Sequence, residues 1–122
     1  QEALLVVSPE PTSLTDAYAA IKVLAMQQKR QYVRLIVNQA ARPGDGRAIT
    51  SQLQQVLDRL VTTESGKPVR LMHMVDIPVD PTVREAVMRR QLLLLQTPGC
   101  PAALAVSQLA GKVEEALLHR AQ

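Results

Sequence analysis

Residues 6–18 read VVSPEPTSLTDAY, and they predict a strand that ends in a turn and is followed by a helix. The apolar run Leu4–Val7 is typical of a buried strand. Pro9 and Pro11 end it, because proline has no backbone N–H for a sheet and restricts the residue before it. The chain enters this strand directly after Gln1, without an initiator Met, as we expect of a cut fragment.

Hydroxyl and acidic residues mark the start of the helix. Ser13 and Asp16 have the spacing of a capping box, with Asp in place of the usual Glu or Gln. We therefore predict a helix over about residues 14–28. In α/β proteins, the point where a parallel strand passes into a helix carries ligands and partner surfaces. The alternative is a strand–turn–helix unit that only caps its own helix.

The remainder of the chain alternates short apolar runs with apolar residues at helical spacing. Strands are predicted at residues 33–37 and 69–75, and residues 62–68 form a polar link between elements. A helix is predicted after each strand, and another after the break at residues 97–101. The residues expected on the apolar faces of these helices are Ala17, Ile21, Leu24, Ala25, Ile49, Leu53, Val56, Leu57, Leu60, Val83, Ala86, Val87, Leu104, Leu109, Val113 and Leu117.

The order of these elements predicts the fold class. Alternating strands and helices form parallel sheets with right-handed crossovers, so we expect an α/β fold with about three parallel strands and flanking helices. No composition shift divides the chain, and residues 1–122 are predicted to be a single domain.

The composition of the chain argues against several classes of protein. The chain has no Phe or Trp and a net charge of only +3, and no nucleic-acid motif is present, so we expect no nucleic-acid partner. Its only cysteine, Cys100, excludes an internal disulfide and fits a reducing cytoplasm. The apolar runs, such as the four leucines at residues 92–95, are much too short to cross a membrane.

Several motifs resemble one family. The Pro-Glu-Pro-Thr-Ser turn, followed by Asp16-Ala17-Tyr18 and then by Ile21-Lys22, is similar to the flagellar site- and number-determining MinD/ParA-like ATPases of the FlhG/FleN type. Division-site MinD proteins share the Pro-Glu but not the Asp-Ala-Tyr, so this tripeptide favours the flagellar branch. The resemblance covers nearly the whole chain and corresponds to the C-terminal half of such a protein. It implies half of a deviant-Walker P-loop ATPase fold.

The resemblance also implies an adenine-binding wall. In that family an Asn at a strand end contacts the base, which corresponds to Asn38, and an Ile-Pro-x-Asp turn borders it, which corresponds to Pro78, Val79 and Asp80. Two structural alternatives stay open. Asn38 could ease the backbone of a strand-to-loop turn. Asp80 could cap the helix that begins at Pro81, and this role is compatible with the first.

The turn after the first strand has an implied role of its own. In MinD-like ATPases it lies on the face that forms the ATP-bound dimer, so Glu10, Thr12, Ser13 and Asp16 are predicted dimer or partner residues. The implied partners are a second copy and flagellar regulatory or switch proteins. Flagellar members bind membranes through an amphipathic C-terminal helix. The acids Glu114 and Glu115 make this helix a poor match, so membrane association is expected only through segments not present here.

The phosphate-binding half of a nucleotide site is absent from the sequence. None of the five glycines begins a Gly-Lys-Thr/Ser loop before a helix, and Gly66-Lys67 is followed by Pro68 and a strand. No strand end is rich enough in Asp for magnesium. ATP and Mg²⁺ are therefore expected only in the intact family protein, and this chain alone is expected to bind neither and to hydrolyse no ATP.

The implied function is the C-terminal part of a bacterial ATPase that regulates flagellar placement and number. The implied location is the cytoplasm, with peripheral association at the inner membrane in the intact protein. Two alternatives remain: a stand-alone interaction module that needs no nucleotide, and a fragment of a cell-division MinD-type ATPase. If Leu4–Val7 normally pairs with the phosphate-loop strand, its edge is bare in this chain, and the isolated chain is expected to pair with another copy along that edge or to swap elements with it.

Overall fold

A computed structural model describes residues 3–61 and 66–121, with side chains up to residue 118. The elements in chain order are β1 (Leu4–Val7), α1 (Pro11–Met26), β2 (Tyr32–Ala40), α2 (Asp45–Leu60), β3 (Arg70–Pro78), α3 (Pro81–Met88), α4 (Leu93–Gln96) and α5 (Pro101–Ala121). The α/β class is confirmed. Most of the polar link at residues 62–68 lies outside the described residues, and α4 was not predicted.

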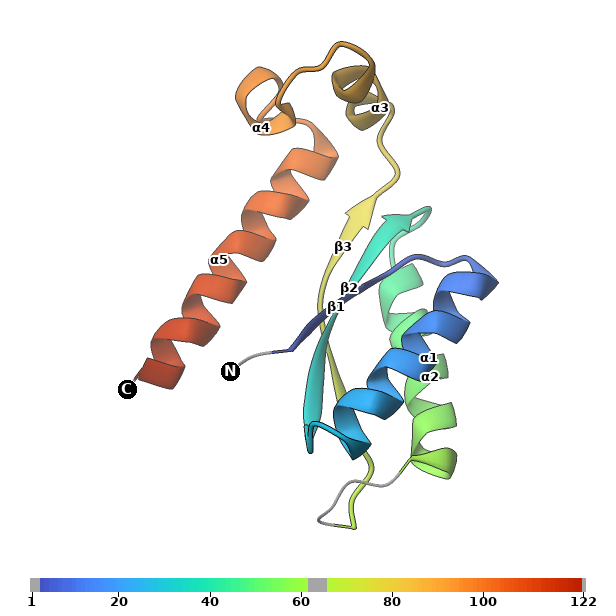
Figure 1. Cartoon of the computed structure of the whole chain (residues 1–122). Coiled ribbons are helices and arrows are strands. Elements are labelled where there is room, and N and C mark those ends of the chain that lie inside the picture. The colour runs from blue at the N-terminus through green and yellow to red at the C-terminus, as the bar shows by residue number, and fades with distance from the viewer. Residues whose placement is uncertain (1–2, 62–65, 122) are drawn as a thin grey trace.

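The three strands form one parallel sheet in the order β1-β2-β3. Val7 of β1 pairs with Val37 of β2, and Asn38 of β2 pairs with Ile77 of β3. The helices α1 and α2 cover one face of the sheet and α5 crosses the other (Figure 1). This arrangement is consistent with part of a P-loop NTPase-like fold.

Two apolar clusters hold the layers together. The larger lies between the sheet and the helices α1 and α2, and includes the fully buried Ile21, Leu35 and Leu57. The smaller joins Ile36, Met74 and Val75 to Ala105 of α5. Because the chain has no Phe or Trp, aliphatic side chains fill both clusters.

The predicted start of the first helix was wrong. α1 begins at Pro11 rather than at residue 14, Glu10 occupies the N-cap position, and no side chain caps the helix. Ser13 instead accepts a hydrogen bond from the backbone N–H of Ser8 (3.0 Å). The helix can begin this early because proline at the first position has a helical φ angle and needs no N–H partner.

Both later strands extend beyond their predicted ends. β2 continues to Ala40, so Asn38 lies within the strand, and β3 continues to Pro78, so Ile77 and Pro78 pair with β2 instead of forming a turn. The predicted strands ended before a polar residue because they were inferred from local runs of apolar residues. In the structure, the hydrogen bonds of the sheet continue past that residue.

The helix faces were predicted correctly for α1 and only in part elsewhere. In α5, Ala102, Ala103 and Ala105 are buried and Leu109 and Val113 are partly buried, but Leu104 and Leu117 are exposed. The reason is that α5 packs on β3 through its small residues, which allow the helix to lie close to the strand. Other predicted core residues that are exposed are Val56, Leu60, Val83 and Val87.

Among the described residues, no helix is both long enough and apolar enough to cross a bilayer.

Candidate functional site at the carboxyl end of the sheet

The predicted site residues lie at one end of the sheet. Because all three strands are parallel, their carboxyl ends meet at the same end of the sheet, which is the end that carries α3 and α4 (Figure 1). This is where open α/β sheets bind ligands. The structure therefore brings the two predicted sets of residues, from β1–α1 and from β2 and β3, to a common end.

Asn38 lies beside an irregularity in β2. The pairing of β2 with β3 shifts between Asn38 and Ala40, and the extra residue, Gln39, has a φ angle of 59°. Asn38 Oδ1 accepts the backbone N–H of Gln39 (3.0 Å). The side chain thus stabilises the bulge, and its Nδ2 donors have no partner among the residues that the structure describes.

The two predicted segments of the adenine wall are neighbours. Asn38 pairs with Ile77 and Ala40 pairs with Pro78, and the N–H of Val79 donates to the carbonyl oxygen of Ala40 (3.0 Å). Val79 is 63% exposed just past the end of β3. A planar ligand at this end of the sheet would therefore meet Asn38 on one strand and the backbone of residues 77–79 on the next.

Asp80 holds the starts of two helices. Its Oδ1 accepts the N–H of Thr82 (2.9 Å) in the first turn of α3, and its Oδ2 accepts the N–H of Ala102 (3.0 Å) in the first turn of α5. These bonds, with that from Ala102 the larger cause, lower the pKa of Asp80 to about 2. The predicted N-cap role is confirmed, whereas the link to α5 was missed.

The predicted partner residues form the start of α1. Glu10, Thr12 and Asp16 are exposed, and Ser13 is half-buried because its oxygen accepts the N–H of Ser8. No residue in the described part of the chain buries these three side chains. They are placed where a partner could reach them, at the same end of the sheet as Asn38.

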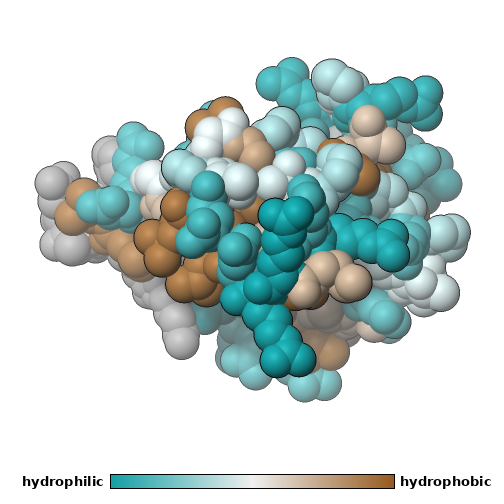
Figure 2. Space-filling model, turned by 90° about the horizontal axis from the view of Figure 1, so that it is seen from above, coloured by the Kyte–Doolittle hydropathy of each residue, from teal (hydrophilic) through white to brown (hydrophobic). Residues whose placement is uncertain are grey.

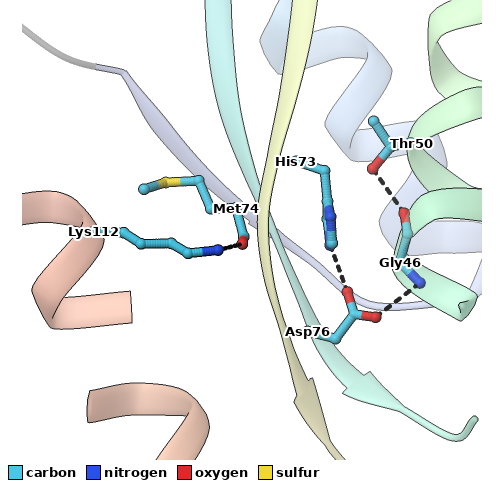
Figure 3. A network of polar contacts seen from close by, with 6 residues as sticks. All are labelled: Gly46, Thr50, His73, Met74, Asp76 and Lys112. Carbon is cyan, nitrogen blue, oxygen red and sulfur yellow. Dashed lines mark hydrogen bonds and ion pairs between the residues drawn. The ribbon is translucent and has the colours of Figure 1, made fainter. Parts of the chain in front are cut away.

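A polar network that was not predicted from the sequence joins α2 to β3 (Figure 3). Asp76 bonds His73 Nε2 through Oδ1 (2.6 Å) and accepts the N–H of Gly46 through Oδ2 (3.2 Å). The carbonyl oxygen of Gly46 in turn accepts from the hydroxyl of Thr50 (2.7 Å). The negative carboxylate lies at the N-terminus of α2, where the helix dipole stabilises it.

Gly46 was the signal that could have revealed this network. Glycine is unfavourable in a helix, so its presence in the first turn of α2 indicates a close approach by another group. A Cβ atom at this position would overlap the carboxylate of Asp76. His73 is therefore part of a structural contact, and within the described residues no cluster of His, Cys, Asp and Glu could hold a metal ion.

The end of the molecule that carries α3 and α4 is also apolar in part. Viewed from above, it shows hydrophobic side chains gathered beside long hydrophilic ones (Figure 2). The exposed apolar residues of α3, α4 and the turn between them are Val83, Val87, Met88, Leu92, Leu94 and Leu95. Large contiguous apolar patches rimmed by polar residues are typical of interaction surfaces.

No protein-family profile matches the sequence. Two curated proteins are similar to it. The antiactivator FleN of Pseudomonas aeruginosa is 39% identical over 114 residues, which are 93% of this chain. The chain resembles the flagellar MinD/ParA-like family. The flagellum site-determining protein YlxH of Helicobacter pylori is 27% identical over 108 residues, or 88% of the chain. The chain spans 39% of the length of FleN and 34% of that of YlxH.

Proposed function

We propose that the chain is part of a flagellar regulatory ATPase of the MinD/ParA-like class, in which it supplies the adenine wall and a surface for partners. The similarity to an antiactivator and to a site-determining protein supports the flagellar role. The neighbouring positions of Asn38 and Pro78 at the ends of two paired strands support the adenine wall, and this is the observation on which the proposal rests.

The orientation of Asn38 suits a base. Because Oδ1 is engaged by Gln39, the side chain offers its two Nδ2 hydrogens to a ligand. The ring nitrogens of adenine accept hydrogen bonds, and its exocyclic amine requires an acceptor, which a backbone carbonyl of residues 77–79 supplies. Asp80 contributes its backbone, since both of its carboxylate oxygens hold helix starts.

Phosphate binding and hydrolysis require groups that the 122 residues lack. The sequence has no Gly-Lys-Thr/Ser loop, so the β- and γ-phosphates and Mg²⁺ would be held by other parts of a longer protein. The proposed partner surface is formed by Glu10, Thr12, Ser13 and Asp16, and it would contact a second copy or a flagellar regulatory protein. The proposed location is the cytoplasm, with any membrane association provided by other segments.

Calorimetric titration tests the adenine wall. We expect no heat when ATP or ADP is added to this chain, and measurable binding of both to the complete gene product. In that complete protein, Asn38→Ala should weaken ATP binding about tenfold and reduce its preference over GTP, because a base-specific hydrogen bond is lost. Gln52→Ala, at an exposed amide on α2, is the control and should change neither. An unchanged ATP affinity in Asn38→Ala would refute the adenine wall.

Partner binding tests the second surface. Asp16→Ala in the complete protein should weaken dimer formation or capture of the flagellar partner without changing ATP affinity in the monomer. Unchanged assembly would count against this surface.

One alternative is an interaction module that needs no nucleotide. A complete gene product that binds its flagellar partner but neither ATP nor ADP would establish that alternative. The division-site reading is weakened by Asp16-Ala17-Tyr18, which resembles the flagellar branch.

A further inference from the structure

A groove of about 980 Å³ runs between α2 and the outer edge of β3. It is separate from the site at the carboxyl end of the sheet, because its strand residues are Tyr32, the first residue of β2, and 70–73, in the first half of β3. The outer edge of β3 has no neighbouring strand in the sheet order β1-β2-β3. Hydrogen-bonding groups of the backbone therefore face the groove.

The side-chain amide of Gln54 makes hydrogen bonds to the backbone at this edge, as the backbone of a neighbouring strand would. Its Nε2 donates to the carbonyl oxygen of Val69 (2.8 Å), and its Oε1 accepts the N–H of Leu71 (2.7 Å). These are the two hydrogen bonds that one residue of an added parallel strand makes, through its own N–H and C=O, to the residues on either side of the one opposite. Asp58 Oδ1 accepts the other hydrogen of Nε2 (2.8 Å) and orients the amide. The edge of β3 thus already binds an amide group from within the chain.

The next outward-facing backbone groups of β3, after the N–H of Leu71, can bond further residues of an added strand. Alternation along a strand directs the carbonyl of Leu71 and the N–H of His73 to the same outer side as the N–H of Leu71. An incoming strand would replace the two bonds of Gln54 with two of its own and would gain partners at these positions. The exchange therefore favours the added strand once it is held in place.

Charge indicates what kind of segment would be held. Among the lining residues that the structure describes, the basic side chains are Arg47, Lys67 and Arg70, and the one acid, Asp58, already accepts from Gln54. An extended segment that carries acidic side chains complements this lining, whereas a basic segment is repelled.

We propose that this groove binds an extended acidic segment of a partner protein, which adds as a strand to the outer edge of β3 and displaces the side chain of Gln54. Addition of a strand to an exposed sheet edge is a recurring mode of peptide recognition. The proposal goes beyond the flagellar function above and does not depend on nucleotide binding.

The test uses an acetylated and amidated eight-residue peptide of alternating valine and glutamate, with the valine–lysine peptide as its charge control. Calorimetry should detect binding of the glutamate peptide alone, and hydrogen exchange at the amides of Leu71 and His73 should slow on binding. Gln54→Ala removes the internal competitor and should tighten binding about tenfold. Gln52→Ala, at an exposed amide of α2 that does not line the groove, is the matched control and should leave affinity unchanged.

Charge reversal gives an independent check. Arg70→Glu should weaken binding about fivefold, whereas Arg59→Glu, on the exposed last turn of α2, should not. Circular dichroism verifies that each variant folds. If Gln54→Ala does not fold, the comparison of Arg70→Glu with Arg59→Glu tests the proposal instead. The proposal is overturned if neither peptide binds or if both bind equally. It is also overturned if Gln54→Ala behaves as Gln52→Ala, or if binding leaves exchange at Leu71 and His73 unchanged.

Discussion

The backbone N–H of Gly46 donates to the carboxylate of Asp76, so that the start of α2 is fixed against β3 at a distance only glycine allows (3.2 Å). Gly46→Ala should destabilise the protein by about 1–3 kcal/mol, because the new methyl group forces the carboxylate away and breaks its contacts. Thermal or urea unfolding measures the change.

Gly111 provides the matched control for that substitution. It lies inside α5 with no atom within 4 Å of where a Cβ would be. Gly111→Ala should therefore stabilise the protein by about 0.5–1 kcal/mol, the usual gain for alanine over glycine in a helix. Equal effects at the two positions would show that the packing around Gly46 is not restrictive.

Removing the carboxylate of Asp80 should loosen two helices together. Asp80→Ala leaves the N–H groups of Thr82 and Ala102 without their acceptor, so we expect the Tm to fall by about 5 °C. Hydrogen exchange should increase in the first turns of both α3 and α5. Faster exchange in α3 alone would contradict the link between them.

The carboxylate of Asp80 should make the stability of the folded protein depend on pH. The pKa of Asp80 is lowered from 3.8 to about 2 in the folded protein, so its contribution is fully present well above pH 3.8 and is lost as the pH falls through about 2. The Tm difference between the wild type and Asp80→Ala should be constant near neutral pH and should shrink below pH 4. A difference that remains constant down to pH 2 would contradict this assignment.

The outer edge of β1 should make this chain associate with itself. β1 has a strand on one side only, and Val6 is 59% exposed. Exposed edges of apolar strands pair with one another. Light scattering should show dimers or larger species at high concentration, and Val6→Lys should reduce them, whereas Val23→Lys on exposed α1 surface should not. A wild type that remains monomeric would refute the prediction.

The sequence predicted the parts of the structure that depend on local pattern. The α/β class, the three strands and the capping role of Asp80 followed from apolar runs, helical spacing and the proline at position 81. The neighbouring positions of Asn38 and Pro78 also followed, once resemblance to a family had aligned the two segments.

Contacts between distant residues could not be predicted in this way. The bonds from Asp80 to Ala102 and from Gln54 to Leu71 join residues that are 22 and 17 positions apart, and no local pattern encodes them. The exposed side of α5 was also unpredictable, because its leucine spacing describes an apolar stripe without saying that the alanines would contact β3.

The carboxylate of Asp80 connects the tip of β3 to α5, a helix of 21 residues that crosses the opposite face of the sheet. The same helix is held to β3 by the packing of Ala105 on Met74 and Val75, and by the bond that Lys112 Nζ donates to the carbonyl oxygen of Met74. A molecule that displaced residues 78–80 would therefore have to disturb the anchored first turn of α5 as well, which ties that end of the sheet to the layer on its opposite face.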